Sequence, residues 1–439
     1  MRVGKMTDNF TALIFGDEDA RVCKDIPEAA CKDTPHNFFA YLGANVLGKI
    51  ADEIASAKLV IPWLFASLGV PIGFTGMLVP IREAGILIPQ LVVAAAVRHK
   101  PKRKGVWLLG AILSALSLLG MAIAALFLEG GIAGIAITGM LIIFSLSRGI
   151  CSVSAKDVLG KTVSKSRRGI LMGMSAGLSG VVVLAIGSWL AIGSFKESEA
   201  TVFAILLATG GILWLGATLI FSMIREQPGA TEGGGNALEV AIRQMKLIVD
   251  DTEFRHYLIT RSLLLCIALA PPFYVLVAQQ QSDTALLGLG ALIIANGLAT
   301  TISAPVWGYL GDRSSRQVMM LASTGAGLLA VYTVTAVWLQ WHWATSELGL
   351  AAIFFVLNVM HGGVRLGRKV YLVDMANADN RAAYVAVSNT VIGLLMLAGG
   401  LLGLVGQLIG ATATVGILGI GSFIAAIYAR TLADVSEPD

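Results

Sequence analysis

The chain has 439 residues, of which 56% are hydrophobic and 14% are charged, and its mean hydropathy is +0.77. Soluble domains carry roughly a quarter charged residues, so this composition excludes a soluble globule and predicts a surface that mostly faces lipid. The net charge is +4, from 32 basic and 28 acidic residues, and in a membrane protein the positions of these charges matter more than their sum. The four cysteines are widely spread and lack metal-site spacing, so we expect no metal site.

Apolar stretches long enough to cross a bilayer run through the middle and end of the chain. A helix needs about 20 apolar residues to cross a hydrocarbon core of ~30 Å. Eight stretches meet this length or come close to it: 106–128, 130–146, 170–195, 200–224, 262–282, 284–311, 317–346 and 348–364. The uncharged run 382–429 would be about 72 Å long as one helix, so we expect it to fold back near Gly406–Thr414. These stretches together predict ten spans.

The first two spans are harder to place. Hydropathy alone favours 59–79 as the first span, but it would leave residues 85–97, about 20 Å of helix, as a second span that is too short. The alternative is a helix from 37 to about 66, a turn at 68–71 and a second helix to 97. We favour this alternative, although it places five charged residues inside the membrane: Lys49, Asp52, Glu53, Arg82 and Glu83.

An internal repeat supports the longer first helix. Arg148 and Asp157 match Arg365 and Asp374 at an offset of 217 residues, which maps the seventh span onto residues 39–64. We therefore predict an all-α integral membrane protein with twelve transmembrane helices in two pseudo-symmetric six-helix halves. The expected divisions are a polar cytoplasmic leader (1–36), an N-terminal half (37–224), a cytoplasmic linker (225–255), a C-terminal half (256–430) and a cytoplasmic tail (431–439).

The charges of the first hairpin should meet at one depth. Asp52–Glu53 and Arg82–Glu83 lie near the middle of their predicted helices, and a charge exposed to lipid there costs at least ~2.5 kcal/mol. We therefore expect them to face a central cavity, with Arg82 neutralising one carboxylate while the other, Asp52 or Glu83, changes protonation. A fixed ion network that only joins the two helices is the competing interpretation.

Polar residues on later spans are further candidates for binding substrate or protons. Asn358, His361 and Arg365 share one face of the tenth span, and a histidine can change its charge between about pH 5 and 8. Asn296 on the eighth span is a similar candidate. The bases expected at the depth of the cavity outnumber the acids, which favours an anionic or zwitterionic organic solute. The bases are Lys49, Arg82, Arg148 and Arg365, and the acids are Asp52, Glu53 and Glu83.

A loop motif resembles a known family. The segment Gly308-Tyr-Leu-Gly-Asp312-Arg313-Ser-Ser-Arg316 is similar to the G-x-x-x-D-R-x-x-R signature of the major facilitator superfamily, and it follows the eighth of twelve helices as in that family. The resemblance implies a conformational latch, in which Gly308 lets helices approach closely, Asp312 caps or pairs with a helix end, and Arg313 and Arg316 hold a cytoplasmic gate.

A second family-like feature pairs an acid at the end of the fourth or tenth helix with an arginine before the next helix. Here the pairs would be Asp157 with Arg168 and Asp374 with Arg381, acting as gate residues rather than substrate ligands. Anchoring of basic loops on the cytoplasmic side is the simpler interpretation of the arginines.

These features predict a secondary active transporter that moves a small organic solute by alternating access, with protons as the coupling ion. One alternative is efflux of drugs or metabolites by proton antiport, but Leu178 stands where the antiporter motif around Gly173 and Gly177 would have proline. Another is a transport-fold sensor or lipid-moving protein. No ATP-binding loop or nucleophile–base pair is apparent, so we expect no enzyme, no cofactor, no nucleic-acid partner and a monomer in the lipid bilayer.

Basic loops set the expected orientation. The bases of residues 98–104 and 156–168 follow the second and fourth helices, whereas the opposite loops contain Lys196 as the one clear base. The positive-inside rule therefore places both termini in the cytoplasm, and the membrane would be the inner membrane in a bacterium.

This orientation predicts a labelling pattern. In a background without the native cysteines, Glu197→Cys should react with an impermeant maleimide added from outside, because its loop faces the periplasm, and Lys102→Cys should not. Efficient outside labelling at position 102 would reverse the orientation.

Overall fold

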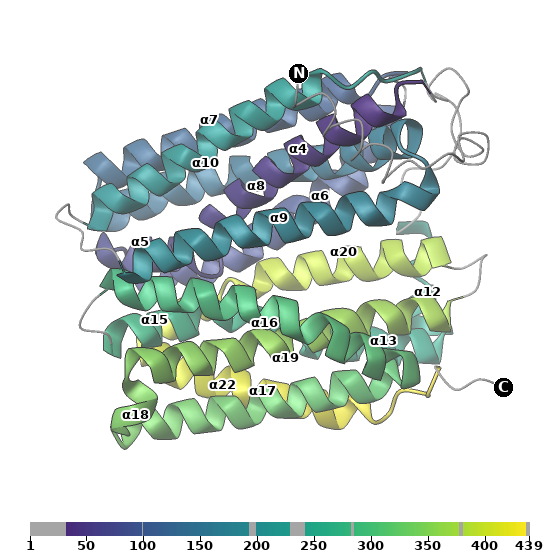
Figure 1. Cartoon of the computed structure of the whole chain (residues 1–439). Helices are drawn as coiled ribbons and strands as arrows, with labels where there is room; N and C mark the ends of the chain where they lie inside the picture. The colour runs from purple at the N-terminus through teal and green to yellow at the C-terminus, as the bar shows by residue number, and fades with distance from the viewer. Residues whose placement is uncertain are drawn as a thin grey trace.

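The computed structural model describes residues 32–98, 100–192, 199–228, 242–281, 285–376 and 381–435. Most of the expected leader, residues 1–31, lies outside this part of the chain. The described elements are all helices, and Figure 1 shows them as two groups, α4 to α10 above and α13 to α22 below, with their long axes roughly aligned. The predicted all-α fold of two six-helix halves is therefore confirmed.

The predicted spans of the first half correspond to α4 (Thr34–Ile54) with α5 (Val60–Ser67), α6 (Ile72–Arg98), α7 (Lys104–Phe127), α8 (Gly130–Thr162), α9 (Lys165–Ile192) and α10 (Glu199–Ser222). Those of the second half are α13 (Thr252–Leu263) with α14 (Leu265–Leu269) and α15 (Pro271–Gln281), α16 (Ala285–Arg313), α17 (Ser315–Trp338), α19 (Glu347–Met375), α20 (Arg381–Gly399) with α21 (Leu402–Ile409), and α22 (Ala411–Ala429). Two short helices, α12 (Leu247–Asp250) and α18 (His342–Thr345), lie in connections.

By length and apolar composition, ten of the described spans are able to cross a membrane. The other two predicted spans form the first hairpin, α4–α5 and α6, and carry charged residues within their helices. The structure gives this hairpin the predicted second helix and the predicted turn, in which Gly69 has a left-handed backbone with φ of +66°, but it divides the predicted first helix into α4 and α5. The long apolar run near the C-terminus also turns back where expected, at Gly410 with φ of +86°.

The first span is broken between Ile54 and Val60. Proline has no backbone N–H and its ring displaces the carbonyl four residues earlier, so Pro62 prevents Lys58 from continuing a regular helix. The backbone turns instead through Ser56, whose carbonyl accepts from the Leu59 and Ile61 amides at 3.3 and 3.0 Å. This break places Lys58 on an irregular segment inside the bundle.

Equivalent helices pack in the same way in the two halves. In the first half α7 packs against α8 and α10, and α6 against α8; in the second, α17 packs against α19 and α22, and α16 against α19. Large apolar side chains on the outer faces, such as Leu116, Ile123, Leu328 and Ile420, are more than half exposed, as expected for helices that contact lipid.

The two halves contact each other through α9 with α16 and through α6 with α20 and α21. Glycines allow the closest approach between the backbones of the two halves. These contacts lie at the end of the bundle that carries α5 and α15 (Figure 1). A Cβ atom on Gly403 would lie 2.3 Å from the Gly73 carbonyl oxygen, and one on Gly290 would lie 2.4 Å from the Ala191 nitrogen. Such backbone contacts exclude any side chain, so they hold the halves together at this end.

The glycines of α9 do not pack closely against other helices. Small-xxx-small spacing is typical of close helix packing, but Cβ atoms on Gly173, Gly177 and Gly180 would meet nothing within 4 Å. α9 turns this face away from its neighbours. The spacing of small residues alone does not tell which face of a helix is packed.

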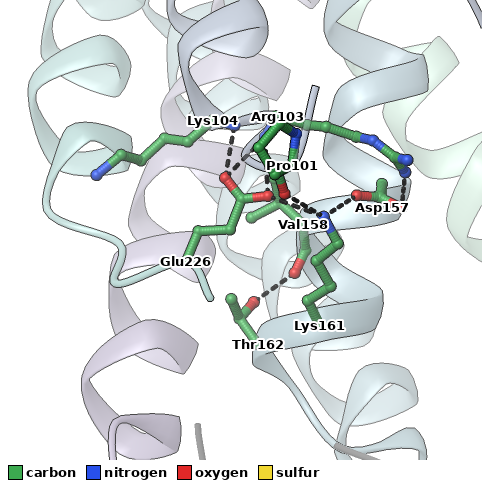
Figure 2. A network of polar contacts seen from close by, with 8 residues as sticks. All are labelled: Pro101, Arg103, Lys104, Asp157, Val158, Lys161, Thr162 and Glu226. Carbon is green, nitrogen blue, oxygen red and sulfur yellow. Dashed lines mark hydrogen bonds and ion pairs between the residues drawn. The ribbon is translucent and has the colours of Figure 1, made fainter. Parts of the chain in front are cut away.

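At the opposite end of the bundle, the residues after α10 anchor the start of α7. The Glu226 carboxylate, almost fully buried, accepts hydrogen bonds from the Arg103 and Lys104 backbone amides at 2.9 and 2.7 Å and from Lys161 Nζ at 3.2 Å (Figure 2). Arg103, the N-cap residue of α7, provides no side-chain cap, so Glu226 supplies the acceptor and a negative charge at the helix N-terminus.

The close contact at Gly403 predicts a conformational effect. Gly403→Ala should force the halves apart at the α5 end, because the added methyl group has no space against the Gly73 carbonyl. Spin labels on Ser67→Cys and Leu408→Cys should show a longer distance in this variant. Gly177→Ala, whose methyl group meets open space, is the matched control, and an unchanged distance in Gly403→Ala would contradict the prediction.

Glu226 should contribute measurably to stability. Glu226→Gln removes a buried charge that accepts from two amides and one ammonium group, which we expect to cost about 2 kcal/mol in the free energy of unfolding. Unfolding of the purified protein in detergent would measure this loss. Glu129→Gln is the control, because Glu129 is an exposed helix N-cap without a side-chain cap bond, and equal stability of the two variants would refute the role.

Candidate functional site

The centre of the first half is an ion cluster around Asp52 of α4. Arg148 of α8 donates Nε to the two oxygens of Asp52 at 2.9 and 3.1 Å and Nη2 to Oδ2 at 2.8 Å. Arg82 of α6 lies on the other side, with Nη2 3.5 Å from Oδ1. One carboxylate therefore compensates two guanidinium groups, which come from two other helices.

Aromatic rings support both arginines. The Arg148 guanidinium carbon lies 4.2 Å from the ring centroid of Trp214, and that of Arg82 lies 5.0 Å from the ring centroid of Phe144. Cation–π attraction strengthens when the ion is removed from water, as it is here. The rings also fix the orientation of the guanidinium groups toward Asp52.

A second ion pair joins the break in the first span to α6. Lys58 Nζ lies 3.3 Å from Glu83 Oε1. Lys58 was not among the residues predicted from the sequence, although it is the one charge between residues 54 and 81 and Pro62 follows it by four residues. The combination of an isolated charge and a helix-breaking proline was the available signal.

Glu53 differs from its two neighbouring acids. Its side chain is exposed, although it lies deep in the bundle, and it forms no ion pair or hydrogen bond with the described residues. The sequence predicted that Arg82 would neutralise one carboxylate and that Asp52 or Glu83 would remain unpaired. The pairing expected for Arg82 agrees with the geometry. The identity of the unpaired acid was predicted wrongly, because Lys58 pairs with Glu83 and leaves Glu53 as the unpaired acid.

The second half contributes polar and basic residues that face these charges across a cavity and form one of its walls. Its α16 presents Asn296, Thr300 and Ser303, which are spaced by one helical turn. Its α19 presents Asn358, His361 and Arg365, which share one helical face as the sequence indicated. The described part of this wall carries amide, hydroxyl and basic groups but no carboxylate.

These two walls enclose one cavity of about 310 Å³. Eight of the nine residues predicted to bind substrate or protons line it together: Asp52, Glu53, Arg82, Glu83, Asn296, Asn358, His361 and Arg365. The ninth, Lys49, is half-buried one helical turn before Glu53 and is not among the lining residues. Their roles remain a prediction.

The predicted latch after α16 is arranged differently from the expectation. A Cβ on Gly308 would meet nothing within 4 Å, so this glycine does not serve a close helix contact here. Asp312 is exposed and makes no ion pair or side-chain hydrogen bond with the described residues. Arg313 donates to the Tyr309 hydroxyl of the preceding turn, with its guanidinium carbon 4.6 Å from that ring centroid.

Asp434, after α22, takes the role expected of Asp312. Its carboxylate accepts from Ser314 Oγ at 2.9 and 3.1 Å and from Arg316 Nη2 at 3.1 Å, while Arg316 Nη1 donates to the Leu432 carbonyl at 3.0 Å. Ser314 in turn caps α17. This acid follows the last helix of the second half and lies far along the chain from the loop. The loop motif does not predict this contact.

The predicted pair of Asp157 and Arg168 is also wrong. Asp157 pairs instead with Arg103 and with Lys161, whose Nζ lies 2.7 Å away (Figure 2). Arg168 donates to the Val163 and Gly160 carbonyls at 3.0 and 2.8 Å and thereby caps the C-terminal end of α8. Free carbonyls at a helix end lie closer to Arg168 than the acid does. The side chain of Arg381, the predicted partner of Asp374, lies outside the described residues.

Comparisons with known proteins agree with this architecture. The family model described as Major Facilitator Superfamily matches residues 264–439. No curated protein matches the sequence.

Solved structures match almost the whole chain. A D-xylose–proton symporter is 14% identical with a TM-score of 0.69, and the match covers 92% of this chain and 100% of that one. The partially occluded inward-open xylose transporter XylE from E. coli is 15% identical with a TM-score of 0.61 and the same coverage. The nucleoside transporter NupG is 12% identical with a TM-score of 0.69, over 89% of this chain and 99% of that one.

The identities are low, so these structures establish the fold, and the family match supplies the independent sequence relationship over the second half. The resemblance found in the loop motif is thus confirmed. The chain is a multi-pass membrane protein with the fold of the major facilitator superfamily, and its second half carries the sequence pattern of that superfamily.

Proposed function

We propose that the protein is a secondary active transporter that moves a small organic solute by alternating access and couples this movement to protons. The observation that carries the proposal is the charged cavity, whose walls come from both halves. A site at the junction of two rigid halves opens to one side or the other when the halves rock. The structures that share the fold include a sugar–proton symporter and a nucleoside transporter, which supports transport as the activity.

The contacts between the halves fit this mechanism. The glycine contacts close the bundle at the α5 end. The opposite end carries the bases of residues 100–104 and 161–168, so we assign it to the cytoplasm by the positive-inside rule. Both termini then lie on the cytoplasmic side.

Glu53 is our candidate for the proton carrier. Asp52 is fixed between two arginines and Glu83 pairs with Lys58, so their negative charges are already compensated. Glu53 faces the cavity together with Lys58, Arg82, Asn296, His361 and Arg365, and none of these is bonded to it. An acid in this position is able to take up a proton without breaking an existing ion pair.

Glu53→Gln should abolish accumulation driven by a pH gradient in proteoliposomes while preserving solute exchange, because glutamine resembles the protonated acid but cannot release a proton. A pH gradient acid on the outside would drive symport inward and antiport outward, which separates the two forms of coupling. Loss of both exchange and driven transport in a folded variant would refute the assignment.

Asp52→Asn is the matched comparison at the adjacent position. It leaves the guanidinium groups of Arg82 and Arg148 without their shared carboxylate, and removal of one partner from a buried ion cluster costs on the order of 3 kcal/mol. We therefore expect a loss of folding stability for Asp52→Asn that Glu53→Gln does not show. Equal stability of the two variants in thermal unfolding would contradict the distinction between a fixed acid and an unpaired one.

A further inference from the structure

The two walls of the cavity differ in charge. Residues 254–281, 285–311, 315–346, 348–373 and 382–429 of the second half contain no acidic residue, whereas α19 places Arg365 and Arg368 within one turn of each other. Arg261 of α13 adds a third base to this half, and it is held by neutral partners, Ser388 Oγ at 2.6 Å and Asn389 Oδ1 at 2.9 Å. In the part of the chain that the structure describes, Arg261, Arg365 and Arg368 form no ion pair with an acid of this half.

Arg365 is the base with direct access to the cavity. Its side chain is exposed there and forms no ion pair or hydrogen bond with the described residues. His361 lies one helical turn earlier on the same face and also lines the cavity. A guanidinium group binds a carboxylate through two parallel hydrogen bonds, so Arg365 offers a ready site for one.

The charges of the residues that line the cavity predict how many negative charges the solute carries. The lining holds three acids and three bases, and Arg148 behind Asp52 adds one more base. After the pairs are formed, Glu53 and Arg365 remain as the unpaired acid and the unpaired base. A proton on Glu53 raises the net charge of the cavity by one, and a single carboxylate restores it.

The remaining lining groups are suited to hydroxyl groups of a solute. Thr300 and Asn358 each donate to a carbonyl of their own helix, at 2.9 and 2.8 Å, which leaves the hydroxyl and amide oxygens as acceptors. Asn296 and Ser303 add polar groups along α16, and Phe354 provides an apolar surface. The volume of about 310 Å³ is at the lower end of the range for small-molecule sites, so the solute must be small.

We propose that the solute is a small hydroxylated monocarboxylate, bound with its carboxylate at Arg365 and His361 and its hydroxyl groups along α16. This assignment rests on the transport function proposed above and specifies the substrate class for the same cavity. It implies that proton and anion move together without net charge.

Binding to the purified protein tests the assignment directly. The probes are four sugar acids, glycerate, threonate, xylonate and gluconate, each paired with the neutral polyol of the same length: glycerol, threitol, xylitol and glucitol. At least one acid should raise the midpoint of thermal unfolding, and its polyol should not. Equal shifts with acid and polyol, or no shift with any acid, would overturn the assignment.

Arg365→Gln should weaken binding of that acid at least tenfold, and Arg365→Lys should retain part of it, because lysine keeps the charge but loses the two-bond geometry. Arg430→Gln removes the same charge from the exposed end of α22, away from the cavity, and should bind the acid like the original chain. Unchanged binding in Arg365→Gln would show that the anion is held elsewhere.

Proteoliposome transport separates failure of this assignment from failure of the proposed function. If a polyol accumulates under a pH gradient and Arg365→Gln transports it at the original rate, transport stands and the anionic substrate is refuted. If an acid binds through Arg365 but neither exchanges nor accumulates, the substrate class stands and transport is refuted.

Discussion

The structure of the cavity depends on the position of Asp52 between Arg148 and Arg82. Three charges inside a membrane protein would each carry a large desolvation cost if left alone. Here one carboxylate accepts from α8 through a bidentate contact and lies within ion-pair distance of α6, so three helices of the first half are joined at one depth. The neighbouring Glu53 and the facing Glu83 are thereby fixed in place relative to the cavity.

The two halves share one architecture but differ in chemistry. Equivalent helices pack in the same pairs, yet the first half brings all the cavity carboxylates and the second brings amides, hydroxyls and bases. A solute that bridges these walls would contact both halves at once, so its binding would couple to their relative movement. The glycine contacts at the α5 end bring the backbones of the two halves into direct contact.

In each half, an acidic residue that follows the last helix binds the start of an earlier helix. Glu226 follows α10 and accepts from the start of α7 and from α8, and Asp434 follows α22 and accepts from Ser314 and Arg316 at the start of α17. The two acids therefore occupy similar structural positions in the two halves. These acids stabilise helix N-termini, where the aligned peptide dipoles favour negative charge.

The amino-acid sequence by itself determined the number of spans, the turn near Gly69 and the fold-back near Gly410, because the length of an apolar run and the thickness of a bilayer leave few alternatives. It also indicated which polar residues would share the cavity, since helical periodicity assigns a face to each side chain. The partners of those side chains were decided by the tertiary structure. Lys58 reaches Glu83 from the break in the first span, Asp157 and Arg316 pair with residues of distant segments, and Arg168 caps the preceding helix. Periodicity gives the direction of a residue but not the distance to its neighbours on other helices, and ion pairs depend on that distance.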